Sequence, residues 1–495
     1  MKKIFLLLFS ISVLSSCDKQ LDQVPISVMS AEGFYNNESD FTLALNGIYS
    51  TLRFYPNSQL RLGEIRSDNI NSQRTADLLS RDIHKFALTI STNQYVADAW
   101  DVGFRGVMKA NTLLEKLNEQ VVPDEAKRKW FEGQAKFLRA FYYFDLIKWF
   151  GPVPFLDKTV TPNEALEIPR SSVSEIYNLI IKDLEDAISV LPVSYSPAER
   201  GYATKYAAQG MLARVYLTRS GPKLNPDGPC LGTNEYQKAL DLLNAVMTGP
   251  FQMLNTYSSI FSFKNENNSE VVFSIQFKSG FGVGGSFPTI LTGTSWWNMV
   301  GLPFQGAGDR NSVSENLLTS YGLDDLREHF SVVREYVSAG VHFTDNPTCI
   351  KFASPEKETW GVFRDDFGID FPVLRFTDVL LMKAECILMG ANGTQQEADN
   401  IINAVRERAG LDPLTDATID DLMEERRKEF LGEGLRWNDL IRSGKVLTVM
   451  NAWIGSIISE GEMTYPIDET QLLYPVPQEQ MDIKKGLYTQ NRGYN

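Results

Sequence analysis

Histidine is scarce in this chain, with three residues among 495. His84, His329 and His342 are isolated and match neither HExxH nor any other ligand spacing. The GxSxG sequence of many Ser hydrolases is also missing. We therefore expect no metal site, no cofactor and no enzyme activity.

Cysteine is scarce as well, with four residues in the whole chain. Cys230, Cys349 and Cys386 are widely and unevenly spaced, so neither a disulfide framework nor a CxxC metal site is supported. Cys386 lies in the apolar run "LLMKAECILM" and is predicted to be a core residue. The fourth cysteine, Cys17, has a different setting near the chain start.

Basic residues are too few to balance the acidic ones. The chain has 48 Lys and Arg against 62 Asp and Glu. Lys2 and Lys3 belong to the N-terminal segment that is expected below to be a signal peptide. Without them 46 basic residues remain, and the formal net charge is −16. Such a surface repels phosphate backbones and anionic headgroups. Nucleic acid is therefore not an expected partner, and a basic patch is not expected to bind the chain to a membrane.

Long apolar runs are missing except at the start. Ile4 to Leu14 follows two lysines and has the length of a signal-peptide core, shorter than the roughly 20 residues of a membrane span. Leu14-Ser15-Ser16-Cys17 then resembles a bacterial lipobox, in which the Cys17 thiol receives a diacylglyceryl group and becomes the mature N-terminus. The alternative is an unmodified cysteine near a secretory cleavage site. We expect a signal peptide over 1–16 and a lipidated tether over 17–29.

Most of the remaining chain has helical periodicity. Trp100, Phe104, Val107, Asn111 and Leu114 form one stripe, which predicts that Trp100 is packed. The segment 124–150 is apolar nearly all round in its second half and stops at a Gly-Pro sequence. The next helix is expected to be capped by the Ser171/Ser172 region.

Small residues recur where later helices would cross. The segments 204–221 and 234–247 form one predicted pair and 379–390 and 394–410 another, with small residues at Ala207, Ala208, Gly210, Ala213 and Ala239. Such pairs resemble tetratricopeptide repeats whose period of about 34 residues is blurred by insertions. We predict a mainly α fold, a tetratricopeptide-like helical hairpin scaffold, with an N-terminal block over 30–250 and a C-terminal block and tail over 373–495.

The helical periodicity of the sequence is interrupted between the two blocks. The segment 251–372 contains "EVVFSIQF", which is strand-like, and loops rich in Asp, Asn and Pro. Within it, Gly280 to Gly308 holds eight glycines, three Phe and the Trp296-Trp297 pair, without a charged residue. We predict a loop-rich, ligand-binding insertion with a few short strands.

Three long motifs together match a known family. "AKFLRAFYYFDLIKWFGPVPF" (135–155), "EERRKEFLGEGLRWNDLIRSGK" (424–445) and the ending "YPVPQEQ" with "QNRGY" resemble the SusD/RagB family of outer-membrane nutrient-binding lipoproteins. The resemblance runs from end to end. It implies four tetratricopeptide-like hairpins, glycan capture without catalysis, and a position at the cell exterior over a SusC-like TonB-dependent transporter.

The chemistry of sugars selects the candidate site residues. Sugar rings pack their C–H faces on aromatic planes, and their hydroxyls pair with amide, carboxylate or guanidinium groups. Two stretches offer such groups, one before residue 96 and one in the insertion. The predicted ligand contacts are Asp68, Asn69, Arg81, Asn93, Trp296, Trp297 and Phe304.

Adjacent tryptophans alternate sides on a strand, so either one anchors the loop or the loop turns between them. Asp68 and Asn69 have turn or capping roles as their alternative. The carboxylates of Glu424, Glu425 and Glu429 and the neighbouring arginines indicate ion pairing within the scaffold. Asp365, Asp366 and Asp370 are weak candidates for a calcium site.

Three functions stay open at this point. The first is capture of an oligosaccharide or polysaccharide and its delivery to a transporter, with attachment to the membrane through the N-terminal lipid only. The second is a helical glycoside hydrolase, which needs two carboxylates about 5 to 9.5 Å apart. The third is a peptide-binding repeat scaffold.

Overall fold

The computed structural model describes residues 34–72, 77–280, 282–302, 311–322, 324–344, 346–354, 360, 366–458 and 466–494. The fold is mainly α, as predicted, with short strands confined to loops and to the segment between α10 and α14. The longer helices are α2 (Glu38–Tyr49), α5 (Gln94–Lys116), α6 (Glu125–Phe150), α8 (Val173–Val190), α9 (Lys205–Ser220), α10 (Tyr236–Val246), α14 (Phe376–Leu388), α15 (Gln395–Arg408), α16 (Ile419–Glu429) and α18 (Val446–Ile458).

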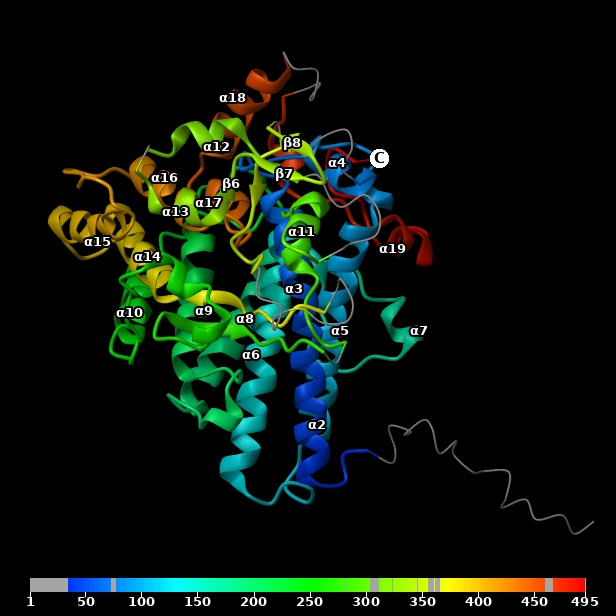
Figure 1. Ribbon diagram of the computed structural model, residues 1–495. Coiled ribbons are helices and arrows are strands. Elements are labelled where there is room, and N and C mark those ends of the chain that lie inside the picture. The colour runs from blue at the N-terminus through cyan, green and yellow to red at the C-terminus, as the bar shows by residue number, and fades with distance from the viewer. Residues whose placement is uncertain are drawn as a thin grey trace, which may run out of the picture.

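Neighbouring long helices pack against one another as hairpins. Helix α5 packs on α6, α8 on α9, α9 on α10, and α14 on α15. Helix α10 also packs directly on α14, although the whole segment with the strands lies between them in sequence. Figure 1 shows the resulting row, in which α14 and α15 follow α9 and α10 on the left of the view and α2, α5 and α6 stand on the other side.

The small residues lie where these helices touch. Ala207, Ala208, Ala213 and Ala239 have no exposed surface. At Gly210 a Cβ atom would lie 2.3 Å from the Leu374 side chain, so a larger residue here would force Leu374 to move. The prediction of small residues at the helix crossings is confirmed, and Ser172 caps α8 in a capping box with Glu175.

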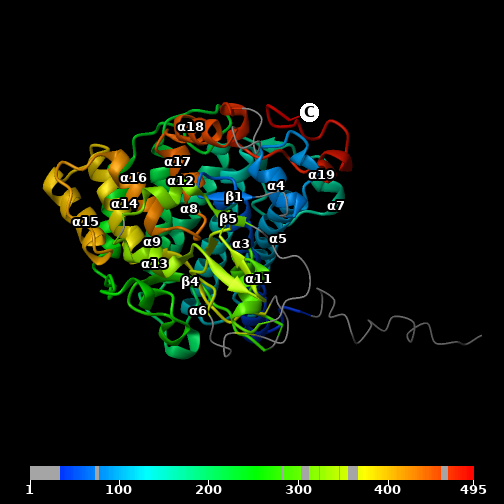
Figure 2. The ribbon, with the colours of Figure 1, turned by 45° about the horizontal axis from the view of Figure 1, so that its top comes forward.

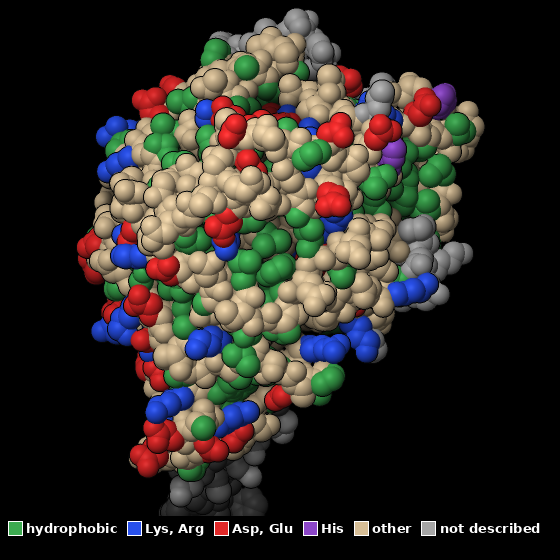
Figure 3. Space-filling view, turned by 90° about the vertical axis from the view of Figure 1, so that its left-hand side faces the viewer, with side chains coloured by type: hydrophobic (Ala, Val, Ile, Leu, Met, Phe, Trp, Pro, Cys, Tyr) green, Lys and Arg blue, Asp and Glu red, His purple; other side chains and the backbone are tan. Residues whose placement is uncertain are grey.

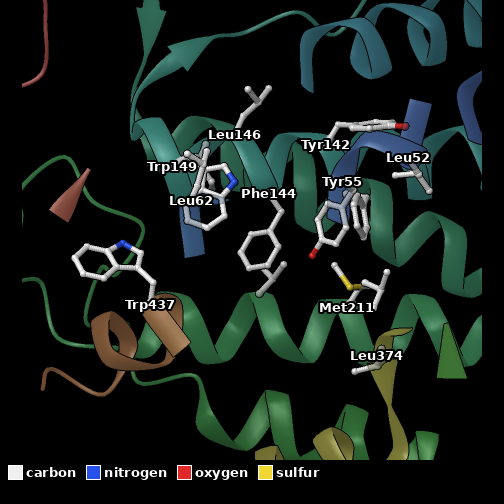
Figure 4. Packing of buried hydrophobic residues seen from close by; sticks show 14 of the residues in the cluster. Leu52, Tyr55, Leu62, Tyr142, Phe144, Leu146, Trp149, Met211, Leu374 and Trp437 are labelled. Carbon is white, nitrogen blue, oxygen red and sulfur yellow. The ribbon is translucent and has the colours of Figure 1, made fainter. Parts of the chain in front are cut away.

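Helix α6 is the centre of the core. From Phe137 to Phe150 nearly every side chain is buried, because neighbours cover all of its faces. Figure 4 shows Tyr142, Phe144 and Trp149 of α6 among side chains that come from residues 50–64, from α9 and from α17 (Arg436–Arg442). The helix ends at Gly151 (φ 68°), as the Gly-Pro sequence predicts. Trp100 on α5 is 3% exposed and packs on Phe150, which confirms its predicted role.

The early segment, residues 50–84, is a chain of short irregular helices that packs on α5 and, through the contact of Tyr55 with Phe141, on α6. A 3₁₀ turn at Ser50–Phe54 leads into α3 (Tyr55–Ser58) and a π-helical turn at Gln59–Glu64. These are followed by strand β1 (Ile70–Ser72) and α4 (Leu78–His84). This segment joins the N-terminal helices to the C-terminal ones, because the π-turn contacts α17.

The strands form short antiparallel pairs. In the described residues β1 pairs with β5, β4 with β10, β2 with β3, β6 with β9 and β7 with β8. Their bounds are β2 (Val153–Pro154), β3 (Arg170–Ser171), β4 (Val271–Ile275), β5 (Asn311–Val313), β6 (Val332–Val333), β7 (Tyr336–Ser338), β8 (Val341–Phe343), β9 (Thr348–Cys349) and β10 (Phe371–Arg375). Pairing of β4 with β10 joins the two ends of the segment between α10 and α14.

Short helices complete the fold. They are α7 (Pro162–Ala165), α11 (Thr294–Met299), α12 (Glu315–Ser320), α13 (Leu326–Ser331) and α19 (Gln478–Ile483). Figure 2 shows α11, α12 and α13 with strands β1, β4 and β5 between the helical blocks. On the side of α10, α14 and α15, acidic and basic side chains are interspersed (Figure 3). In the described part of the chain no helix combines the length and the apolar character of a bilayer span.

Candidate functional site

The two stretches predicted to carry the site meet in the fold. Strand β1, from the early segment, pairs antiparallel with β5, with Ile70 opposite Val313 and Ser72 opposite Asn311. Ser314 continues the contact, since its backbone N–H donates to Asn69 O (2.8 Å) and its hydroxyl to Asp68 O (2.6 Å). The candidate site is therefore built around the β1–β5 pair.

Asp68 and Asn69 are structural residues in this arrangement. Asp68 is 1% exposed and accepts two hydrogen bonds from Arg436, while Arg427 lies 3.0 Å away. Burial alone would raise the pKa of Asp68, but the two guanidinium groups outweigh it and lower the pKa to about 2. Asn69 has no exposed surface; it donates to Glu64 and accepts from Arg427. Their polar groups hold the strand on α16 and α17, which removes the basis for predicting ligand contacts at these two positions.

Asn93 also has a structural role. It is the N-cap of α5, where its side chain accepts from Tyr95 N–H (3.0 Å) and donates to Leu79 O (2.9 Å), and it is 2% exposed. An N-cap satisfies a backbone donor that the helix leaves unpaired, so the expectation of a ligand contact at Asn93 has no support in the geometry. Arg81 lies on α4 and is partly exposed. Phe304 and Cys17 lie outside the described residues.

The Trp296-Trp297 pair lies on the short helix α11 rather than on a loop or strand. Trp297 has no exposed surface and Trp296 is 5% exposed. Their rings meet edge to face, with centroids 5.0 Å apart. Trp297 thus serves as the anchor that the sequence left as one alternative, and Trp296 is the member of the pair that keeps some exposure.

The two indoles belong to an aromatic cluster separate from the main core. The cluster consists of Trp296, Trp297, Tyr336, Ala353 and Phe367, with Phe343 and Trp360 partly buried against it. The Tyr336 and Phe343 rings are stacked across the β7–β8 pair at 5.0 Å. This small core gives the segment its own support, independent of the α6 core, as expected for loops that carry function.

A polar groove lies beside the β1–β5 pair, on the face of β1 that points away from the core. Ile70 and Ser72 point into the core, and Asn71, between them, lines the groove. The groove encloses about 660 Å³ between β1, α12, α16 and α18. Its lining residues are Asn71, Ser314, Glu315, Asn316, Thr319, Ser320, Glu424, Arg427, Lys428, Trp453, Ser456 and Ile457.

The groove offers hydrogen-bonding groups without an excess of charge. Two carboxylates, Glu315 and Glu424, face two cations, Arg427 and Lys428. Asn71 Oδ1 and Glu424 Oε1 are buried and accept no hydrogen bond within the described residues, although Glu424 lies 3.8 Å from Arg427. Such acceptors fit the hydroxyls of a neutral polar ligand.

Sequence reasoning missed most of this groove. Asn71 lay inside a stretch that was predicted to bind ligand. No sequence pattern singled out the residues of α12 or α18 as ligand contacts. Glu424 and Arg427 belong to a motif that indicated ion pairing. That ion pairing is confirmed, although most partners lie on other elements: Glu425 pairs with Arg327, and Arg426 with Asp378 and Asp439.

The other reactive groups of the sequence are engaged in the fold. Cys386 has no exposed surface, as predicted, and Cys230 and Cys349 are buried and free. The Asp366 carboxylate accepts from the backbone of Gly280 and Gly284. No group of three His, Cys, Asp or Glu side chains with metal-ligand geometry occurs in the ranges that the structure describes.

Comparisons with known proteins agree with this architecture. Residues 27–217 match the family model described as "Starch-binding associating with outer membrane", and residues 347–494 match that of the "SusD family". The SusD-like protein P25 of Formosa agariphila is 25% identical, over 91% of each chain. The starch-binding protein SusD of Bacteroides thetaiotaomicron is 22% identical over 73% of this chain and 72% of its own.

Solved structures share the fold. Surface glycan-binding protein A from Bacteroides thetaiotaomicron, in complex with laminarihexaose, superposes with a TM-score of 0.79 at 23% identity, covering 92% of this chain and all of that one. The two family models lie at opposite ends of the chain and together span well over half of it. With the hairpin scaffold and the three motifs, they establish that the chain belongs to the SusD/RagB family.

Proposed function

We propose that this protein is a cell-surface lipoprotein that binds an oligosaccharide or polysaccharide nutrient and delivers it, chemically unchanged, to a partner TonB-dependent transporter in the outer membrane. The observation that carries the proposal is the polar groove beside β1–β5. It combines amide, hydroxyl and carboxylate groups with apolar lining residues, among them Trp453, whose side chain is 3% exposed. These are the groups that hydroxyls and C–H faces of sugars require.

The names of the relatives support a glycan as ligand. One relative is named a starch-binding protein, and the structure of a solved neighbour is a complex with laminarihexaose. In the groove we assign Asn71 and Glu424 as acceptors for sugar hydroxyls. Of the contacts predicted from the sequence, we retain as proposed ligand contacts Arg81, which is partly exposed, and Trp296, whose side chain is 5% exposed where that of Trp297 has no exposed surface.

Calorimetry tests the groove. A glycan array first selects a neutral oligosaccharide that binds the wild-type chain. The double variant Asn71→Ala/Glu424→Gln should then raise its Kd about tenfold or more, because the acceptor of Asn71 is lost and the acceptor of Glu424 loses its charge. The control is Asn400→Ala, at an exposed position on α15 that does not line the groove. Equal affinity in wild type and double variant would exclude the groove as the site.

A product assay separates capture from hydrolysis. Glu315 and Glu424 are the carboxylates that line the groove in the described residues. Under our proposal the purified chain releases no reducing sugar from the bound oligosaccharide. Release that Glu424→Gln abolishes would establish a glycoside hydrolase instead.

The tether and the partner need separate tests. Cys17→Ser should move the protein from the membrane fraction to the soluble fraction and abolish labelling by radioactive palmitate. Affinity purification of the lipidated chain should co-purify an outer-membrane barrel. Retention of the Cys17→Ser variant in the membrane would contradict the lipid anchor.

A further inference from the structure

A second cleft lies away from the groove and shares no lining residue with it. It encloses about 620 Å³ between the end of α2, the turn that follows Pro197–Glu199, and the chain that leaves β4. Helix α2, whose end lines the cleft, lies in the lower part of Figure 1, whereas α12 and α18, which line the groove, lie in its upper part. The cleft therefore needs an explanation of its own.

The charge of the cleft is opposite to that of the protein. Arg53, Arg200 and Lys278 line it together with a single carboxylate, Glu199, whereas the whole chain has a formal net charge of −14. Within the described residues neither Arg53 nor Arg200 forms an ion pair with a carboxylate. Cations gathered in a concave, partly desolvated surface attract an anionic group more strongly than dispersed ones.

Arg53 has spare donor capacity. Its Nη2 donates to Gly282 O (3.2 Å), which fixes the guanidinium, while its buried Nε has no acceptor in the part of the chain that the structure describes. A buried donor without a partner is costly unless a ligand or water satisfies it. Arg200 also lines the cleft and is exposed, on the turn that continues into Gly201. Gly201 has φ 101°, and a Cβ atom there would lie 2.9 Å from Gln276.

Two tyrosines and two amides also line the cleft. The Tyr49 and Tyr202 rings meet edge to face at 5.4 Å, and Tyr202 donates to Asn46 (2.7 Å). Tyr49 accepts from Ala203 N–H and donates to Gln134, so its ring is fixed in place. Asn46 and Gln276 add amide groups. Fixed tyrosine rings and amides suit a sugar ring and its hydroxyls, and the guanidinium groups suit an acidic substituent.

We propose that this cleft is a second saccharide site, selective for sugar residues that carry a carboxylate or a sulfate ester. This proposal rests on the proposed function, because both take a glycan as ligand, but the residues that line the cleft are not those that line the groove. The neutral groove would bind the uncharged part of a ligand, and the cationic cleft would add affinity for an acidic one.

The test is calorimetry on the full chain with two matched pairs of probes. One pair is tetragalacturonate and its methyl ester, and the other is a sulfated galactan tetrasaccharide and its desulfated form. In at least one pair the charged member should bind the wild type about tenfold more tightly or better, and this preference should decrease as NaCl is raised. Absence of a preference for the charged member in both pairs would overturn the proposal.

Variants locate the effect. Arg53→Gln/Arg200→Gln should remove the preference for the charged probe and leave the binding of the neutral oligosaccharide unchanged. Arg200→Glu alone, at an exposed position, should reduce this preference without affecting folding. A preference that persists in the double variant with unchanged thermal unfolding would place the anion site elsewhere. Loss of neutral binding in Asn71→Ala/Glu424→Gln concerns the groove, so the two failures are distinguishable.

Discussion

Arg436 donates from Nε and Nη2 to the two carboxylate oxygens of Asp68, at 2.8 and 2.9 Å, and thereby joins α17 to the early segment across 368 positions of sequence. Both side chains are nearly inaccessible to solvent. A bidentate pair of this kind fixes orientation as well as distance. The family motif at 424–445 therefore acts as the clasp between the N-terminal and C-terminal helices.

Removing the carboxylate should destabilise the whole protein. Asp68→Asn leaves Arg436 and Arg427 buried without their charged partner, at a cost of about 3 to 5 kcal/mol. Urea unfolding monitored by circular dichroism measures the change. Glu167→Gln, which removes an exposed partner of Lys484, is the control and should change stability by less than about 1 kcal/mol. A similar small effect for both variants would show that the clasp contributes little.

The same pair sets an acid limit. The folded pKa of Asp68 is about 2, below its unfolded value, so the stabilisation is complete above the unfolded pKa of about 4 and is lost as the pH falls toward 2. Asp68→Asn should therefore flatten this part of the stability profile between about pH 4 and 2. An unchanged slope in the variant would assign the acid sensitivity to other carboxylates.

Asp370 should show the opposite pH dependence. Burial, with Glu266 nearby, raises its pKa to about 8; Oδ1 accepts from Phe277 N–H, and Oδ2 has no partner among the described residues. Because the folded state holds this proton more tightly than the unfolded state, stability falls as the pH rises from about 4 to 8. Asp370→Asn keeps the acceptor without the charge. It should stabilise the protein by roughly 1 to 3 kcal/mol at pH 8 and have little effect at pH 4, as measured by thermal unfolding at the two pH values.

The aromatic cluster makes a prediction about the paired tryptophans. Trp297→Ala leaves a cavity among buried rings and should cost about 3 to 5 kcal/mol. Trp360→Ala, at a partly exposed member of the same cluster, is the matched control and should cost less. Trp296→Phe should cost less stability than Trp297→Ala, because it removes only part of a buried ring, and it should weaken glycan binding measured by calorimetry. Equal losses of stability for Trp297→Ala and Trp360→Ala would contradict the assigned anchor.

The scaffold could be predicted because its signals are local. Periodicity or backbone constraint predicts three of its features. These are the apolar residues on all faces of α6, the end of this helix at the Gly-Pro sequence after Phe150, and the buried alanines of α9. The side chains of Asp68, Asn69 and Asn93 have the right chemistry for sugars, but the same chemistry serves ion pairing and helix capping. Only their distant partners, Arg436, Arg427 and the α5 N-terminus, decide between these roles.

The groove itself depends on contacts between segments that are far apart in sequence. Asn71 lies in β1, Ser314 just after β5, and Trp453 on α18. Each side chain is unremarkable in its own segment. Their common location follows from the pairing of β1 with β5 and from the clasp at Asp68, neither of which has a local sequence signal.

A glycine in the family motif is required for backbone reasons that a substitution can test. Gly434 has φ 73°, and a Cβ atom there would lie 2.7 Å from Gln59. Its N–H donates to Glu64 (2.9 Å), so the close approach also satisfies a buried carboxylate. Gly434→Ala should cost about 2 kcal/mol or more, because it adds both strain and a contact with the backbone of the π-turn.

Gly455, on α18 with open space around its Cβ position, is the control. Gly455→Ala should leave stability unchanged or raise it by about 0.5 to 1 kcal/mol, because alanine is the better helix former. Thermal unfolding of both variants gives the comparison, and a tolerated Gly434→Ala would show that the approach of this turn to Gln59 is not needed for the clasp.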